Sequence, residues 1–184
     1  MNLGKNLLVS CTGLLLCACS AVFVTEPIGE NALALEDSWS GTWLVEGDVI
    51  QTAVLDGGKG LLKAAWIERG DKGFEFKQHP VHVRYSGENR FVSVLDEEDG
   101  QGYVWALVRQ DSANKILLWS PDPERFAELV GEGVIPGSMQ EPDNPDNGNV
   151  VLGELEAEHI ERIVDPASGL LDWQNPLVMV RILD

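Results

Sequence analysis

Three histidines are the side chains with which this chain could bind a transition metal. His79 and His82 are three positions apart in a segment where apolar and polar residues alternate, so in an extended strand they face opposite sides. His159 lies far away in sequence, in a predicted helix. Zinc sites need three or four converging ligands. This spacing therefore predicts neither a metal site nor a cofactor.

The acidic loop from Asp143 to Asn149 partly matches a calcium-binding loop. Asp143, Asn147 and Gly148 fall on the first, fifth and sixth positions of an EF-hand. Pro145 stands at the third position, which should supply an oxygen ligand, and prolines before the loop prevent an entering helix. The pattern therefore favours a solvated turn. Calcium at the acidic turn Asp96–Asp99 has no stronger support.

No arrangement of residues predicts catalysis. Ser138 and Ser168 lie in Pro/Gly-containing loops without a nucleophile-elbow sequence, and the segment Asp56–Gly60 lacks the spacing of a phosphate-binding loop. Acidic residues are so frequent in this chain that pairs of carboxylates carry no information about hydrolysis. We predict no catalytic residue.

Large aromatic side chains are the remaining candidates for a binding site. One predicted strand carries Tyr103, Trp105 and Leu107 on one face, and its other face is also apolar. A strand that is apolar on both faces is either central in a sandwich or faces a cavity. Core packing is the simpler interpretation. If the domain holds a ligand, the side chains predicted to bind it are Trp43, Trp66, Tyr103 and Trp105.

The charge of the chain restricts its partners. Its 184 residues carry a net charge of −17, and the segment 121–184 holds 14 acidic residues against three basic ones. Such a field repels DNA, RNA and anionic lipid head groups. The composition therefore argues against nucleic-acid binding.

The elements that must position these residues are mainly short strands. Turn-forming residues separate the segments, and Pro80 interrupts the middle of the series. Two helices, Pro123–Val130 and Glu154–Val164, and a last strand, Leu177–Leu183, follow. We predict a mainly β fold, an antiparallel meander that closes as a barrel or sandwich, with two short helices in the C-terminal third. The predicted strands are Thr42–Val45, Val49–Leu55, Leu61–Ile67, Phe74–Lys77, Val81–Tyr85, Phe91–Leu95, Tyr103–Val108 and Ile116–Trp119.

The N-terminus has the form of a secretory signal. Lys5 precedes an apolar stretch, Leu7–Ala18, that is shorter than the roughly 20 residues of a membrane-spanning helix. The following Leu16-Cys17-Ala18-Cys19 resembles the lipobox of bacterial lipoproteins. This resemblance implies a diacylglyceryl group on Cys19, cleavage before it and acylation of the new amine. By the same resemblance, Ser20 rather than Asp favours the outer membrane of a Gram-negative cell.

These features divide the chain into a signal peptide at residues 1–18, a lipidated N-terminus and tether at 19–38, and a single β-rich domain at 39–184. The three cysteines are Cys11, Cys17 and Cys19, so the mature chain would hold no disulfide. Attachment to the membrane would come from the acyl chains on Cys19. A single acyl chain binds a membrane only marginally, whereas several chains together anchor a protein stably.

The segment Gly41-Thr42-Trp43, at the start of the first predicted barrel strand, resembles the opening motif of the lipocalins. These small barrels carry apolar ligands, and in them the Trp plugs the closed end. We identify neither the family's Thr-Asp-Tyr motif near mid-chain nor its late Arg that packs on the Trp. Two predicted helices also differ from the family's single late helix. The resemblance implies a lipocalin-shaped barrel.

Taken together, we expect an envelope lipoprotein without enzymatic activity that binds a partner protein or an apolar ligand at the membrane surface. A small periplasmic hydrolase with an unrecognised carboxylate site is one alternative, and a structural or assembly factor of the envelope is another. A hollow closed barrel would favour the ligand, carboxyl groups converging in a cleft the hydrolase, and a flat apolar patch the assembly factor.

Overall fold

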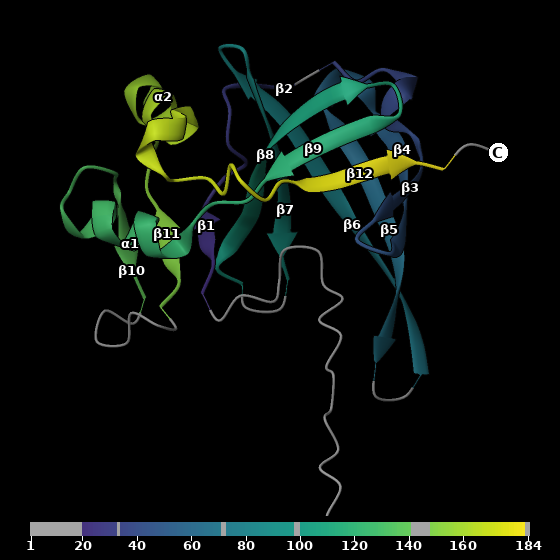
Figure 1. Cartoon of the computed structure of the whole chain (residues 1–184), viewed down its shortest axis with the longest axis horizontal. Coiled ribbons are helices and arrows are strands. Elements are labelled where there is room, and N and C mark those ends of the chain that lie inside the picture. The colour runs from purple at the N-terminus through teal and green to yellow at the C-terminus, as the bar shows by residue number, and fades with distance from the viewer. Residues whose placement is uncertain (1–19, 33, 71–72, 98–99, 141–147, 183–184) are drawn as a thin grey trace, which may run out of the picture.

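The alternation of apolar and polar side chains after Ser40 produces a meander of antiparallel strands that closes on itself. The computed structural model describes residues 20–32, 34–70, 73–97, 100–140 and 148–182. Each strand of the meander pairs with the next, and the last strand, β12, pairs with both β9 and β3. The result is a closed eight-stranded barrel (Figure 1). Its strands are β3 (Gly41–Val45), β4 (Asp48–Asp56), β5 (Leu61–Gly70), β6 (Gly73–Ser86), β7 (Asn89–Asp96), β8 (Gly102–Ser112), β9 (Lys115–Trp119) and β12 (Leu177–Arg181).

This architecture confirms the predicted mainly β fold and decides between its two forms in favour of the barrel. Closure removes the unpaired edges that an open sheet would expose. The inward side chains form one apolar core, called the inner core below. Its buried members include Trp39, Trp43, Ile50, Leu62, Val83, Val92, Ala106, Val108, Ile116, Leu118 and Met179.

A second layer covers one side of the barrel. Strand β1 (Val22–Val24) pairs with β8 and, in parallel, with β11 (Val150–Leu152), which pairs with β10 (Gly137–Met139). The helices α1 (Pro123–Gly131) and α2 (Ala157–Val164) lie beside these strands (Figure 1). Between this layer and the outer face of the barrel is a second apolar core, the outer core. Its buried members include Val22, Phe91, Trp105, Leu107, Trp119, Phe126, Leu129, Ile135, Val150, Ile163 and Leu170.

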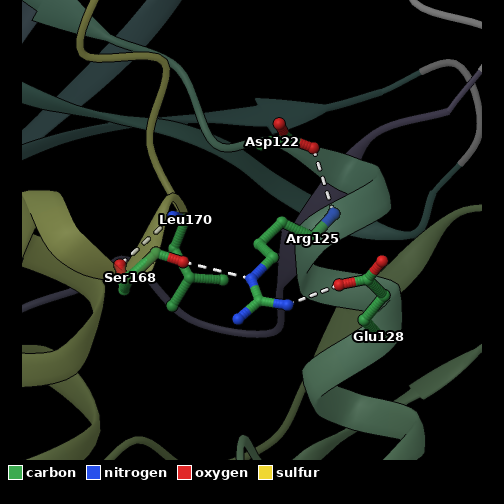
Figure 2. Close-up of polar contacts among 5 residues, drawn as sticks. All are labelled: Asp122, Arg125, Glu128, Ser168 and Leu170. Carbon is green, nitrogen blue, oxygen red and sulfur yellow. Dashed lines mark hydrogen bonds and ion pairs between the residues drawn. The ribbon is translucent and has the colours of Figure 1, made fainter.

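The start of α1 follows the sequence prediction. The Asp122 carboxylate accepts a hydrogen bond from the Arg125 backbone N–H at 3.0 Å, as an N-cap should, and Pro123 occupies the first turn (Figure 2). The Arg125 side chain also donates to the Ser168 carbonyl at 3.1 Å and pairs with Glu128. The contact with Ser168 connects α1 to the short helix η3 (Pro166–Ser168), which follows α2.

Two predictions require correction. Pro80 does not divide two strands, because β6 runs through it for 14 residues. At this point β6 becomes an edge strand, since its pairing with β7 begins only at Val81, and proline is tolerated at sheet edges. The predicted tether 19–38 also contains structure. Val22 and Val24 are 2 and 3 % exposed in the outer core, and the two-residue strand β2 (Asn31–Ala32) pairs with β6.

Candidate ligand cavity

One end of the barrel is closed by two tryptophans and an arginine. The indole N–H of Trp43 donates to the Thr52 hydroxyl at 2.8 Å, and this hydroxyl donates to the Trp39 carbonyl at 2.6 Å. The guanidinium of Arg181, at the end of β12, lies 4.5 Å from the centroid of the Trp43 ring. It donates to the carbonyls of Ser38, Ser40 and Ala113. Three segments that are far apart in sequence are thus joined at this end.

Gly41 makes room for this arginine. A Cβ atom at position 41 would lie 2.6 Å from Arg181 Nη1, and the residue has a positive φ of 157°. Any side chain here would therefore displace the guanidinium from the Trp43 ring. From the sequence we identified no late arginine that packs on the Trp, whereas in the structure Arg181 lies over the Trp43 ring. Its contact could not be read from the sequence because it lies 138 positions after Trp43.

The interior of the barrel is hollow. A cavity of about 400 Å³ extends from Trp39 at the closed end towards the opposite end, where its lining includes Glu68 and Glu97. Most of its wall is aliphatic, with Ile50, Leu62, Val92, Val108, Leu118 and Met179 among the contributors. Pockets that hold small ligands have volumes of this order and walls of this kind. The cavity lies at the lower end of that range, so it would accept one small molecule.

The mouth of the cavity is polar and mostly acidic. Glu68, Asp96 and Glu97 line it together with Lys77. The ammonium of Lys77 is 3.6 Å from the carboxylate of Glu75, so the one cationic side chain in this lining already has an acidic neighbour. The adjoining β5–β6 hairpin carries three exposed apolar side chains, those of Ile67, Phe74 and Phe76, and Phe76 also lines the cavity.

Between the aliphatic wall and the mouth lie two nitrogen-bearing rings. Trp66 on β5 and His79 on β6 both point into the cavity, and their ring centroids are 5.3 Å apart with an interplanar angle of 27°. Trp66 Nε1 and His79 Nδ1 are buried and have no hydrogen-bond partner among the described residues. Sequence reasoning identified Trp66 from its apolar row but did not assign His79 to the same site. The sequence feature that could have identified His79 is its place in the alternation along β6, where it shares a face with the apolar Val81 and Val83.

The other predicted ligand residues lie elsewhere. Trp43 is fully buried and belongs to the closed end rather than to the cavity wall. Tyr103 and Trp105 face the outer core, where the Trp105 ring meets Phe91 and Phe126 edge to face. The prediction took the face of β8 that carries the large aromatic residues, and the structure places this face against the outer core rather than against the cavity. The face towards the cavity carries the smaller Val104 and Val108.

The structure places the three histidines in different environments. His79 and His82 do face opposite sides of β6, as predicted, since His82 meets the ring of Tyr103 outside the barrel at 5.7 Å. Burial, and secondarily the nearby Arg84, lower the pKa of His82 below its ordinary value. His159 Nδ1 accepts a hydrogen bond from the Glu156 backbone N–H at 3.0 Å, at the start of α2. Among the described residues, no three His, Cys, Asp or Glu side chains are grouped as metal ligands.

Several sequence predictions fall outside the described residues. These are the signal peptide 1–18, Cys19 and most of the calcium-like loop from Asp143 onward. Within the part of the chain that is described, no helix has the length and apolar character needed to cross a membrane.

A second hollow lies at the surface between residues 24–30 and α2. It measures about 620 Å³ and is lined mostly by polar atoms, and its residues include Glu26, Glu30, Arg84 and Glu154. This composition differs from that of the barrel cavity and fits water better than an apolar ligand.

Comparison of this chain with models of known families, with curated proteins and with solved structures gave no significant match.

Proposed function

We propose that this chain is a lipid-anchored protein of the bacterial envelope that binds one small apolar molecule inside its barrel and catalyses no reaction. The observation that carries the proposal is the hollow inner core. An unfilled apolar cavity costs stability, because the atoms that line it lose packing partners. The same chain packs its outer core with large aromatic side chains. Retention of a cavity beside such a core is expected of a site that is filled by a ligand.

The anchoring part of the proposal is supported by the motif Leu16–Cys19. The position of β1 gives it a geometric consequence. Val22 is buried in the sheet three residues after Cys19, and three extended residues span only about 10 Å. A lipid on Cys19 would therefore hold the barrel domain directly against the membrane surface, where an apolar ligand is available.

Ligand binding is tested with a fluorescent apolar probe, N-phenyl-1-naphthylamine, whose emission rises when it enters an apolar site. Ala64 lines the cavity, whereas the next residue, Ala65, faces the outside of the barrel because side chains alternate along β5. We expect Ala64→Phe to abolish saturable probe binding and Ala65→Phe to leave it unchanged. Equal binding by both variants and by the wild type would place the probe outside the barrel and refute the proposal.

Anchoring is tested by labelling cells with a palmitate analogue. We expect incorporation into the wild type and into Cys17→Ala, and none into Cys19→Ala, which should also stay unprocessed. Normal labelling of Cys19→Ala would refute the anchor without affecting the proposed ligand cavity.

A further inference from the structure

Two buried nitrogens inside the cavity lack the partners that buried polar groups normally have. The large majority of buried side-chain polar atoms in folded proteins are hydrogen-bonded, because leaving one unpaired costs free energy. Trp66 Nε1 and His79 Nδ1 are both unpaired among the described residues. They lie on neighbouring strands, diagonally across the β5–β6 pairing, and their rings are stacked with centroids 5.3 Å apart, so the two rings are neighbours in the cavity wall.

The position of this pair separates it from the other unpaired groups. Ser93, Trp105 and Trp173 also carry buried polar atoms without a partner, but they do not line the barrel cavity, and Trp105 is packed between aromatic rings. Trp66 and His79 adjoin a space of about 400 Å³ that a ligand can enter. Their hydrogen bonds can therefore be supplied by a ligand.

The chemistry of the pair restricts the polar group of that ligand. An indole N–H only donates, so the ligand atom beside Trp66 must accept a hydrogen bond. The Nδ1 of a neutral histidine either accepts or donates. A hydroxyl group satisfies both atoms, because it accepts from Trp66 and can donate to His79.

Charge at the mouth favours a neutral group over a carboxylate. Glu68, Asp96 and Glu97 line the entrance, and the neighbouring Lys77 is paired with Glu75. The whole chain also carries a net charge of −17. An anionic ligand would be repelled on its way in and would enter a site that offers no unpaired cation in its described lining.

We propose that the barrel binds a single-chain amphiphile with a hydroxyl head, and that Trp66 and His79 hold this hydroxyl while the aliphatic wall covers the chain. This inference rests on the proposed function, since it assumes that the cavity holds a ligand. It names the chemical class of that ligand and the two side chains that recognise it.

The test is displacement of N-phenyl-1-naphthylamine by three compounds of equal chain length, decanol, decanoate and decane, at neutral pH. Protein purified from cells expressing the full chain is used. We expect decanol to displace the probe at about tenfold lower concentration than decane, since two hydrogen bonds at roughly 1 kcal/mol or less each separate them. Decanoate should be the weakest competitor.

Three variants test which side chains cause the advantage of decanol over decane. Trp66→Phe and His79→Phe keep a ring in place and remove the nitrogen, so each should lower the advantage of decanol over decane while leaving decane unchanged. Trp105→Phe removes an unpaired indole N–H from the outer core and should change neither. The unfolding midpoint of each variant shows that it is folded, and if His79→Phe fails to fold, Trp66→Phe decides alone.

The possible failures are distinguishable. If decane and decanol compete equally in the wild type, the polar pair does not recognise a ligand, and the apolar cavity proposal still stands. If decanoate competes best, the hydroxyl assignment is refuted. If neither the probe nor any competitor binds, the proposed function itself is refuted.

Discussion

The two faces of β8 are equally apolar, yet they border cores of opposite character. On the outer face Trp105 meets the rings of Phe91 and Phe126 at centroid distances of 6.1 and 5.8 Å, and the space is filled. On the inner face Val104 and Val108 border a cavity of about 400 Å³. The difference is one of side-chain volume rather than of polarity. Hydrophobic pattern alone therefore cannot distinguish a filled core from a hollow one.

The largest loss of stability is expected when a large side chain of the filled outer core is shortened. Phe126 is fully buried against Trp105, and Phe126→Ala should lower the free energy of unfolding by about 3–5 kcal/mol. Urea unfolding measures this, and probe binding by the folded fraction should persist. A loss below about 1 kcal/mol would mean that the outer core is not closely packed.

The next largest loss of stability is expected from a substitution at the closed end of the barrel. Arg181→Met removes three hydrogen bonds to carbonyl groups and the contact with Trp43, so we expect a loss of about 2–4 kcal/mol. Arg109→Met is the matched control, because Arg109 stacks on Trp119 at 5.1 Å, is exposed and makes no such set of bonds in the structure. Equal losses in the two variants would contradict a role for the carbonyl contacts.

Enlarging a side chain should distinguish the two cores directly. Val150 is fully buried in the outer core, where Val150→Phe should cost about 1–3 kcal/mol or more through overpacking. Ala64→Phe extends into the cavity and should change stability by less than about 1 kcal/mol. Thermal or urea unfolding compares them. A cost for Ala64→Phe as large as that for Val150→Phe would show that the cavity is not available space.

The smallest effect concerns pH and the outer face of β6. The pKa of His82 is lowered by burial and by Arg84, so the folded state binds its proton less readily than the unfolded state. The contribution of His82 to stability is therefore complete above its ordinary pKa of 6.5 and decreases as the pH falls towards its lower pKa in the folded state. His82→Gln should show a weaker loss of stability than the wild type across this window. Identical pH dependence in both proteins would contradict the shift.

The strands of the barrel were predictable because each carries its own signal. The alternation along β4, β5, β7 and β8 placed these strands within a few residues of their observed bounds, and Asp122 and Pro123 placed the start of α1. Strands β1 and β11 were not predicted. Each has three residues. β1 is held in the sheet by β8 and β11, and β11 by β1 and β10, and both strands contribute to the outer core rather than carrying a periodic pattern of their own.

The candidate site was only partly predictable. Trp66 was identified because it lies in an apolar row of its strand. The outward position of Tyr103 and Trp105 could not be predicted, because a strand that is apolar on both faces does not reveal which face turns inward. His79 joins Trp66 only through the pairing of β5 with β6, which sets their diagonal contact.

By itself, the sequence determined what is local to short segments: the strand periods, the turns, the helix cap, the strong negative charge and the resemblance of Leu16–Cys19 to a lipobox. Only the tertiary structure decided what depends on distant segments. It closed the barrel through β12, brought Arg181 onto Trp43 and turned the smaller face of β8 inward. The physical reason is that a cavity is a difference between enclosed space and side-chain volume, and that difference exists only after the strands have closed around it.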